Sequence, residues 1–434
     1  MKLKVLVFGL LFALAVLQAF SAVKKESAEK PFYSNPTTYV LSAECARTTG
    51  KVLILCSDDK IRAIAEESIG DDPGHALFLG IYAALTGQPA HLTDYAVVNA
   101  VINVTGIVAL TALLYWLKLP AASIFFLAVA PLVSQRYLFN SMHTSHFGAT
   151  CLAMIPAIFI LATAPLDKRR SAKTWFIAAI IGLGIASLIR QSAGLMGLVA
   201  GLLAVSYRIF AAPRTIHNLA FYTVALVALY VSYNTPAIVF KARDVAYGLQ
   251  PSEQMETHGI WHNLYIGLGA ADNPFGISWV DSNGLEHARA INPSVKYASK
   301  EYYDILKVAY FDVVKKYPLA VARVYAEKLA MAVRHGKIWV MLLASLIPVL
   351  LLRFSGPAQK FFPEGIDATL LVSSLFVCFF LAQAALFHYA MQFLYPITVS
   401  FTLMCGISVE LVVRRYLRAT TGASLSAGSP GHQA

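Results

Sequence analysis

Long apolar runs recur along this 434-residue chain, and they constrain its fold more than any other feature. A helix needs about 20 apolar residues to cross the hydrocarbon of a bilayer, and it satisfies its own backbone hydrogen bonds there. Charged residues make up 14% of the chain, whereas soluble proteins carry about 25%. The sequence therefore predicts an all-α polytopic membrane protein with about ten transmembrane helices, at about 5–22, 92–117, 121–139, 147–165, 175–190, 192–211, 218–236, 337–353, 367–388 and 392–413.

Two segments between these runs are too polar to lie in the membrane and too long to be simple connectors. Long ordered loops usually carry function, so each is expected to form a subdomain. The first run follows Lys2 and Lys4 and could be a cleaved signal peptide, but we favour an uncleaved anchor. The predicted layout is an N-terminal transmembrane module (1–236) with a first loop (23–91), a second loop subdomain (237–336), C-terminal transmembrane helices (337–418) and a disordered tail (419–434).

Basic residues in the short connections predict the orientation. Ten spans put both termini on one side, and that side carries 14 Lys and Arg residues against four acids. Cytoplasmic loops are enriched in Lys and Arg, so we expect cytoplasmic termini and external long loops. The same pattern explains the net charge of +11 without a nucleic-acid partner. Since the single glycosylation sequon, at Asn103, falls inside a span, a bacterial inner membrane with a periplasmic site is favoured.

An adjacent acidic pair, Asp58 and Asp59, stands out in the first loop. The pair follows the apolar patch 52–55, and the residues 61–65 after it are expected to form a short amphipathic helix. A carboxylate near the bilayer surface could act as a general base on an acceptor hydroxyl, or could bind a divalent metal ion. A solvated helix start is the remaining alternative.

The first loop also contains Cys45 and Cys56, which the orientation places in an oxidising compartment. A disulfide between them would stabilise the loop by about 3 kcal/mol. We expect this bond to have a structural role, fixing the approach to Asp58. A further helix is expected from Gly74 to Leu85, ended by Gly87.

The order of these features resembles a known group of enzymes. The chain has an N-terminal span, an external loop with an acidic pair, Pro73, and then LFLGIYAALTG and VNAVINVTGIVALTALLYWL. This layout is similar to the lipid-carrier-dependent glycosyltransferases of the GT-C superfamily, in the branch of the protein O-mannosyltransferases and aminoarabinose transferases. GLGIASLIRQSAGLMG (182–197) resembles the group's fifth and sixth spans. HYAMQFLYP (388–396) resembles its last-span pattern, with Gln392 and Phe393 in place of Arg-Tyr.

The resemblance implies transfer of a hexosyl or pentosyl group from a polyprenyl-phosphate donor to a lipid, glycan or protein acceptor. By this resemblance, Asp58 and Asp59 match the positions of the group's essential carboxylate and are the expected catalytic residues. Arg190 ends the fifth predicted span on the outer side, where a guanidinium could bind the donor phosphate or simply reach the interface. Arg136, at the end of the third span, is a second candidate.

Two histidines, His143 and His146, follow the third span in NSMHTSHFG. They could bind substrate, contribute to a metal site whose other ligands are not readable, or be ordinary interfacial residues. No cofactor is therefore indicated with certainty, and a divalent metal stays an open alternative.

The second loop contains a stretch rich in residue types that contact sugars, HGIWHNLYIGLGAADNPFGISWVDSNG (258–284). Its aromatic rings could stack on sugars, or could pack at the membrane interface. Helices are expected to follow, from about Ser299 to Lys316 and from Pro318 onward. The candidate substrate-binding residues in this stretch are Trp261, His262, Asn263, Tyr265, Asn273, Trp279 and Asp281.

Two other functions stay open. HNLYIGLGAADNPFG is similar to the His-Asn-x-x-Leu stretch of O-antigen ligases and polymerases, which would make His262 the base. A transporter is the third alternative. Transport is disfavoured because the charges lie at span ends and in external loops rather than at mid-bilayer.

Overall fold

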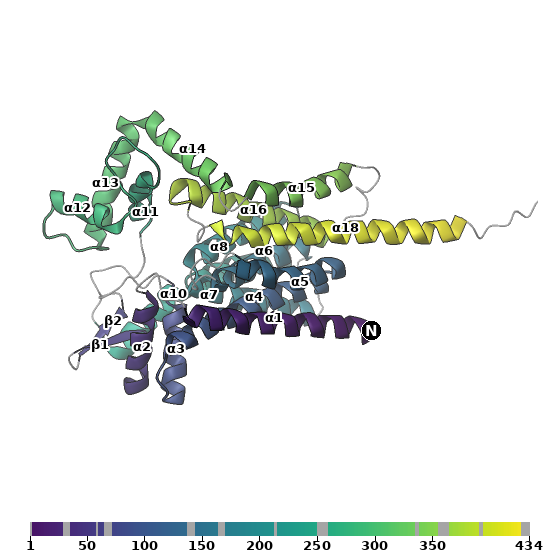
Figure 1. Ribbon diagram of the computed structural model, residues 1–434, viewed down its shortest axis with the longest axis horizontal. Helices are drawn as coiled ribbons and strands as arrows, with labels where there is room; N and C mark the ends of the chain where they lie inside the picture. Colours follow the sequence, from purple (N-terminus) through teal and green to yellow (C-terminus); the bar gives the residue numbers. More distant parts are fainter. Residues whose placement is uncertain are drawn as a thin grey trace, which may run out of the picture.

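The computed structural model describes residues 2–28, 35–57, 60–64, 72–136, 144–163, 170–211, 215–249, 259–334, 338–354, 364–389 and 394–426. Helices dominate this part of the chain, and they form a bundle with two groups of elements at one end (Figure 1). Seven described helices are long and apolar enough to cross a membrane. An eighth span is added if two helices that meet at a 64° bend, Pro318–Arg334 and Ile338–Ile347, are counted together. The protein is thus an all-α polytopic membrane protein.

All ten predicted spans lie largely within helices. Among the described residues, the apolar parts of the first and third are Leu6–Ser21 and Pro120–Gln135. The helices that contain the predicted spans are α1 (Lys2–Ala28), α4 (Leu92–Trp116), α5 (Pro120–Arg136), α6 (Thr144–Ala162), α7 (Arg170–Ile189), α8 (Gln191–Ala211), α9 (Ile216–Tyr233), α15 (Ile338–Phe354), α16 (Glu364–Leu386) and α18 (Ile397–Ser426).

Helix α6 is the centre of the bundle. In its apolar stretch of 18 residues, 94% of the residues are buried. The helix packs against α4, α7, α8 and α16. In the apolar stretch of helix α9, only 22% of the residues are buried, so this helix lies at the edge of the bundle. The α4–α6 contact depends on Gly106 and Gly148, because a Cβ atom on either glycine would overlap backbone atoms of the other helix. Small residues allow this close approach in membrane helices.

A buried carboxylate organises the bundle end that carries the N-terminus. Glu410 of α18 is 2% exposed, and it accepts hydrogen bonds from the backbone N–H groups of Ala121 (2.8 Å) and Ala122 (3.1 Å) at the start of α5. It also accepts one from Arg414 Nε (2.6 Å). A negative charge is favourable at a helix N-terminus, which explains why this acid is tolerated inside a helix pair.

The first loop combines two helices with a short β-hairpin. Its elements are α2 (Asn35–Thr49), β1 (Ile54–Ser57), β2 (Lys60–Ala63) and α3 (Gly74–Thr86). The expected amphipathic helix over 61–65 is wrong: Lys60–Ala63 pairs antiparallel with β1, with Cys56 opposite Ile61. Ile54, Leu55 and Ile61 suit a half-buried strand, and that pairing outweighs the helical spacing.

The second loop forms a helical subdomain. Its elements are α10 (Thr235–Tyr247), α11 (Ile260–Gly267), the 3-10 turn η2 (Leu268–Ala270), α12 (Asp281–Ile291), α13 (Lys300–Lys316) and α14 (Pro318–Arg334). Helices α11 to α13 share a core with buried Tyr302 and Leu306, while α10 packs against the first loop through Phe240. Figure 1 shows both loops at the bundle end opposite the N-terminus, the arrangement expected if they lie on one side of the membrane.

Candidate functional site

An ion pair joins the first loop to the bundle at the α7–α8 junction. Arg190 Nη1 donates to Asp72 Oδ2 at 2.9 Å, and the backbone N–H of Gln191 donates to Asp72 Oδ1 at 2.8 Å. The side chains of Arg190 and Asp72 are 21% and 14% exposed. Gln191 is the first residue of α8, so the Asp72 carboxylate also faces the positive end of that helix. The pair fixes Arg190 at the end of the bundle that carries the loops.

Local chain geometry explains why Asp72 reaches α7. Asp72 has a positive φ of 57°, which Asp tolerates better than most residues. Pro73 and Gly74 then start α3. A Cβ on Gly74 would lie 2.9 Å from backbone atoms of Leu188, so only glycine allows this approach to the end of α7. The sequence Asp-Pro-Gly therefore serves to place the carboxylate beside Arg190.

His75 forms a buried polar cluster next to this ion pair. It is fully enclosed at the start of α3, and its Nε2 donates to Asn99 Oδ1 at 2.7 Å. The rings of Tyr95 and Tyr39 lie 4.8 and 5.8 Å away. Burial lowers the pKa of His75 to about 4, against the opposing effects of Asn99 and the Asp72 backbone. The imidazole is therefore neutral near pH 7 and stiffens the α3–α4 contact beside Asp72.

Some candidates from the sequence lie outside the described residues. These are Asp58, Asp59 and His143, together with the Arg136 side chain. Their proposed roles stay predictions. His146, in contrast, is described: it lies buried in the first turn of α6, next to Ser145, which contacts His75 (3.4 Å).

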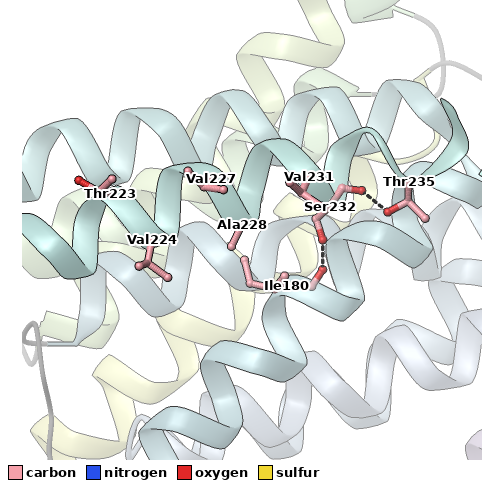
Figure 2. A pocket seen from close by; sticks show the side chains of 8 residues that line it. All are labelled: Ile180, Thr223, Val224, Val227, Ala228, Val231, Ser232 and Thr235. Carbon is pink, nitrogen blue, oxygen red and sulfur yellow. Dashed lines mark hydrogen bonds between the residues drawn. The ribbon is translucent and has the colours of Figure 1, made fainter. Parts of the chain in front are cut away.

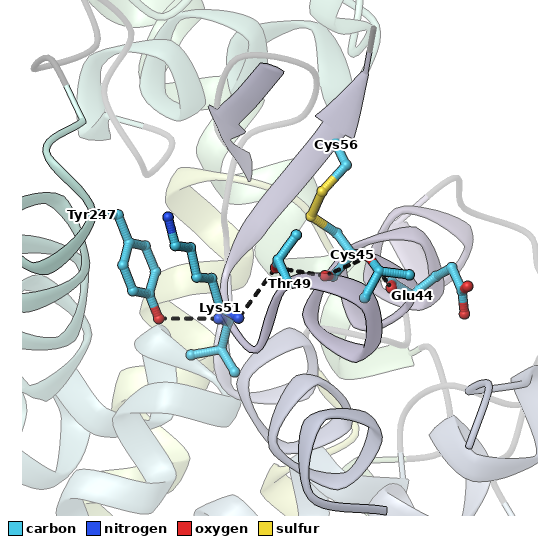
Figure 3. Close-up of a disulfide and its surroundings, with 8 residues drawn as sticks. Glu44, Cys45, Thr49, Lys51, Cys56 and Tyr247 are labelled. Carbon is cyan, nitrogen blue, oxygen red and sulfur yellow. Dashed lines mark hydrogen bonds between the residues drawn. A yellow bond between two sulfur atoms is a disulfide. The ribbon is translucent and has the colours of Figure 1, made fainter. Parts of the chain in front are cut away.

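The β-hairpin that flanks positions 58 and 59 is firmly attached. Cys56 of β1 forms a disulfide with Cys45 of α2, as the sequence predicted, with Cα atoms 5.5 Å apart (Figure 3). Residues just before β1 contact α10: the Val52 N–H donates to Tyr247 Oη (3.1 Å), and Arg243 Nη1 donates to Leu53 O (3.2 Å). The hairpin is thereby held by both loops.

Comparisons with known proteins give the following. No family model and no curated protein matches the chain. Two crystal structures of ArnT from Cupriavidus metallidurans are similar to it. The structure bound to undecaprenyl phosphate has 12% sequence identity and a TM-score of 0.32. The apo structure has 14% identity and a TM-score of 0.33. Both alignments cover 98% of this chain and 81% of the ArnT chain. Because these TM-scores are low, the similarity carries no argument about the site.

The second loop places His262 in its interior. His262 is fully buried, with Nε2 3.1 Å from Asp281 Oδ1 and Nδ1 2.6 Å from Tyr302 Oη. A carboxylate only accepts, so Nε2 carries the proton and Nδ1 accepts from the Tyr302 hydroxyl. Burial raises the pKa of Tyr302, which keeps that hydroxyl protonated. These contacts make His262 part of the subdomain core and argue against a role as base.

The other candidates in this stretch are mainly packing residues. Trp261 lies against Phe311 (5.4 Å) under the Lys307 ammonium, and Tyr265 is buried against His287 (5.1 Å). Asn273 bonds the backbone of its own turn, and the Trp279 ring lies 4.6 Å from the His388 ring, tilted by 44°. Asn263 is half-buried on α11 and Asp281 is exposed. Of these residues, Tyr265 lines a cavity between α12 and α13, and a role of the set in sugar binding stays a prediction.

A groove of about 490 Å³ runs between α7 and α9 (Figure 2). Its lining is mostly aliphatic, including Ile180, Val224 and Val227. Ser232 and Thr235 close one end through hydrogen bonds to the Ile180 and Ser232 carbonyls. The lining has no ionisable group, so this groove cannot supply acid–base chemistry.

The start of α3 meets the end of α7 at Asp72, His75 and Arg190, and we call this place the α3–α7 junction. Sequence reasoning missed most of the residues that the structure brings together there. Asp72, His75 and Asn99 were not candidates, although the signal was present: a second acidic pair directly before Pro-Gly, and a His and an Asn inside apolar helices. Among the described residues no group of three or more His, Cys, Asp or Glu side chains could hold a metal ion.

Proposed function

We propose that this protein is an integral membrane glycosyltransferase that moves a sugar from a polyprenyl-phosphate donor to an acceptor on the extracytoplasmic face. The observation that supports this most is the Asp72–Arg190 pair. It holds a guanidinium at 2.9 Å from a carboxylate, partly exposed, at the bundle end where both loops gather. A polyprenyl-phosphate donor carries its phosphate at the membrane surface, level with this end of the bundle. Its hydrocarbon tail would lie among the apolar helices.

Arg190 would bind the phosphate of the donor. A guanidinium carries five N–H donors in one plane and recognises phosphate through paired hydrogen bonds. Asp72 and the rigid α7–α8 turn set the orientation of that plane before substrate arrives. Preorganised positive charge stabilises the leaving phosphate most as negative charge develops on it, so Arg190 would act on the transition state as well as on binding.

Asp58 or Asp59 would act on the acceptor. In the proposed step the acceptor oxygen forms a bond to the anomeric carbon while the bond from that carbon to the phosphate oxygen breaks. The hydroxyl proton passes to the carboxylate, and polyprenyl phosphate leaves. The hairpin anchored by the Cys45–Cys56 disulfide and by α10 would keep these carboxylates at the bundle end. A divalent metal bound by this pair stays an alternative to general-base action.

The setting follows from the same proposal. The donor is a hexosyl or pentosyl polyprenyl phosphate, and the acceptor is a lipid, glycan or protein. The enzyme would be a multi-pass protein of a bacterial inner membrane, with cytoplasmic termini and a periplasmic site. The 14 basic residues on the side of the termini support this orientation.

One set of variants tests the proposal against the ligase alternative. Asp58→Asn, Asp59→Asn and His262→Ala are made singly, and sugar transfer from a radiolabelled polyprenyl-phosphate sugar is measured in membrane vesicles. We expect at least one Asp change to abolish transfer while His262→Ala lowers only the amount of folded protein. Asp272→Asn, an exposed carboxylate of the second loop, is the matched control.

Two outcomes would contradict the proposal. Full activity in both Asp variants with loss per folded molecule in His262→Ala would favour the ligase. Uptake of a labelled solute by reconstituted vesicles without any transfer product would favour a transporter.

A further inference from the structure

The second loop carries a groove that its own core does not fill. A cavity of about 930 Å³ lies between α12 and α13, in the subdomain that stands beyond the end of the bundle (Figure 1). Tyr265 and Ile277 form its buried floor. Ile291 at the end of α12 and Val308 on α13 line it, yet they are 62% and 61% exposed. Two branched aliphatic side chains on facing elements thus remain open to a partner.

The charges along this groove follow the repeat of α13. Residues four apart lie on one helix face, and one such row reads Lys300, Asp304, Val308 and Asp312. Two carboxylates therefore flank the exposed valine, about 12 Å apart along the helix. Asp304 bonds Lys300 at 2.6 Å in an exposed pair, which adds little stability. Asp312 makes no hydrogen bond or ion pair with another described residue.

A further polar group faces the same cavity. The imidazole of His287, on α12, contacts Tyr265 ring to ring, and no described residue forms a hydrogen bond with it. Glu301 adds a third carboxylate, held by Asn292 at 2.7 Å. The lining is acidic on balance, in a chain whose net charge is +11.

This chemistry selects one class of occupant. Carboxylates on both sides of the valine repel the phosphates of anionic lipids. An oligosaccharide needs flat, accessible aromatic faces, but the Tyr265 ring is buried and the half-buried Phe275 ring packs against Tyr317 at 5.7 Å. An amphipathic helix with basic side chains matches both the apolar strip and the flanking charges, and such helices commonly bind grooves of this kind.

We propose that the α12–α13 groove binds a basic amphipathic helix of a partner protein. Lys or Arg side chains about eight residues apart would pair with Asp304 and Asp312. An apolar residue midway between them would cover Val308 and Ile291. The groove is a docking surface distinct from the α3–α7 junction, and its occupation does not depend on which reaction the bundle catalyses.

The test uses a defined probe and the full chain. A fluorescent, alanine-based helical peptide carries two lysines eight residues apart with a leucine midway, and a second peptide has glutamate in place of both lysines. Binding to the protein in zwitterionic nanodiscs is followed by fluorescence anisotropy. We expect the lysine peptide alone to bind, with affinity falling as salt rises from about 0.05 to about 0.5 M, because exposed charge pairs are screened.

Three variants locate the binding. Val308→Asp and the double variant D304N/D312N should each weaken it about tenfold or more, the effect of losing one good contact. Val245→Asp on α10 changes a valine that is also open, 78% exposed, and should leave binding unchanged.

Any of three results would overturn the proposal: equal binding of the glutamate peptide, no effect of Val308→Asp, or an equal loss in Val245→Asp. Displacement of the lysine peptide by a neutral oligosaccharide or by anionic vesicles would assign the groove to that other ligand. This result would also overturn the proposal.

Discussion

The two loops of this protein use similar residue types for different purposes. In the first loop, Asp72 reaches out of its own subdomain and bonds Arg190 and the start of α8. In the second loop, His262 turns inward and bonds Tyr302 and Asp281 of the same subdomain. One set of polar groups links a loop to the membrane bundle, while the other holds a loop together.

This difference shows how to weigh a motif rich in His, Asp and aromatic residues. The second loop has the denser set of residue types that the sequence predicts to bind sugars, yet its most conspicuous histidine is fully buried. The first loop offers a short acidic-Pro-Gly sequence, and it places a charge beside an arginine at the bundle end. The direction in which a polar side chain points and its exposure to solvent distinguish a candidate site from a core. The number of such residues in a segment does not.

The largest expected effect breaks the link between the first loop and the bundle. Arg190→Ala should lower sugar transfer per folded molecule by about 10²- to 10³-fold, as for loss of one preorganised donor to a developing anion. Arg190→Lys keeps the charge but not the planar donor set, so it should recover only part of the activity. Initial rates at saturating donor measure this.

The control for this prediction lies in the second loop. Arg323→Gln removes an exposed arginine paired with Glu327 at 2.7 Å and should leave the rate unchanged. If Arg190→Ala keeps the full rate, the first loop is a structural element like the second and the distinction between them fails.

Acid should loosen helix α3 of the first loop. His75 has a pKa of about 4 when folded, against about 6.5 when unfolded. Between these values the unfolded chain binds a proton that the folded chain does not, so stability is full above pH 6.5 and falls as pH drops toward 4. The loss is at most roughly 3.4 kcal/mol. Hydrogen exchange at pH 7 and pH 4.5, corrected for intrinsic rates, should show α3 losing more protection than α13.

A variant checks the assignment to His75. His75→Gln keeps a side-chain donor for Asn99 but does not titrate, so the acid-dependent difference between α3 and α13 should disappear. An unchanged difference in His75→Gln would mean that other groups cause the acid sensitivity.

Much of the fold could be predicted because it follows local rules. Apolar length identified the membrane helices, and Ser299 and Pro318 marked the starts of α13 and α14. Gly87 ends α3 with a positive φ of 67°, as a helix C-cap requires. The hairpin at 54–63 was missed because four-residue strands carry little pattern, and cross-strand pairing with β1, not local spacing, decides the conformation of Lys60–Ala63.

The site was harder to predict because it depends on contacts between distant residues. Arg190 was a candidate from its position at a span end, but its partner Asp72 lies 118 residues away. Their meeting requires Gly74 to pack on Leu188, a contact that sequence spacing does not encode. The disulfide was predictable, since the first loop contains only two cysteines.

Removing the disulfide should weaken the first loop alone. Closing a loop of this length stabilises by about 2.8 kcal/mol in the chain-entropy account, so the double variant C45S/C56S should lower the unfolding free energy of the α2–hairpin region by that order. Limited proteolysis should then cut near residues 50–63 while α11 to α13 stay protected. Cys378→Ser, an exposed free cysteine, is the matched control, and equal sensitivity of both loops would contradict the independence of the two subdomains.

The smallest expected effect tests whether the second loop is held by its internal network. Tyr302→Phe removes the hydroxyl that donates to His262 Nδ1 (2.6 Å), and loss of such a hydrogen bond costs about 0.5 to 1.5 kcal/mol. The unfolding temperature in detergent should fall, while transfer per folded molecule stays constant because the hydroxyl acts only within the core. Tyr82→Phe on the exposed face of α3 should change neither quantity. If Tyr302→Phe instead lowers transfer without lowering stability, His262 and Tyr302 take part in the reaction. The two loops would then form one site together, and the second loop would not be purely structural.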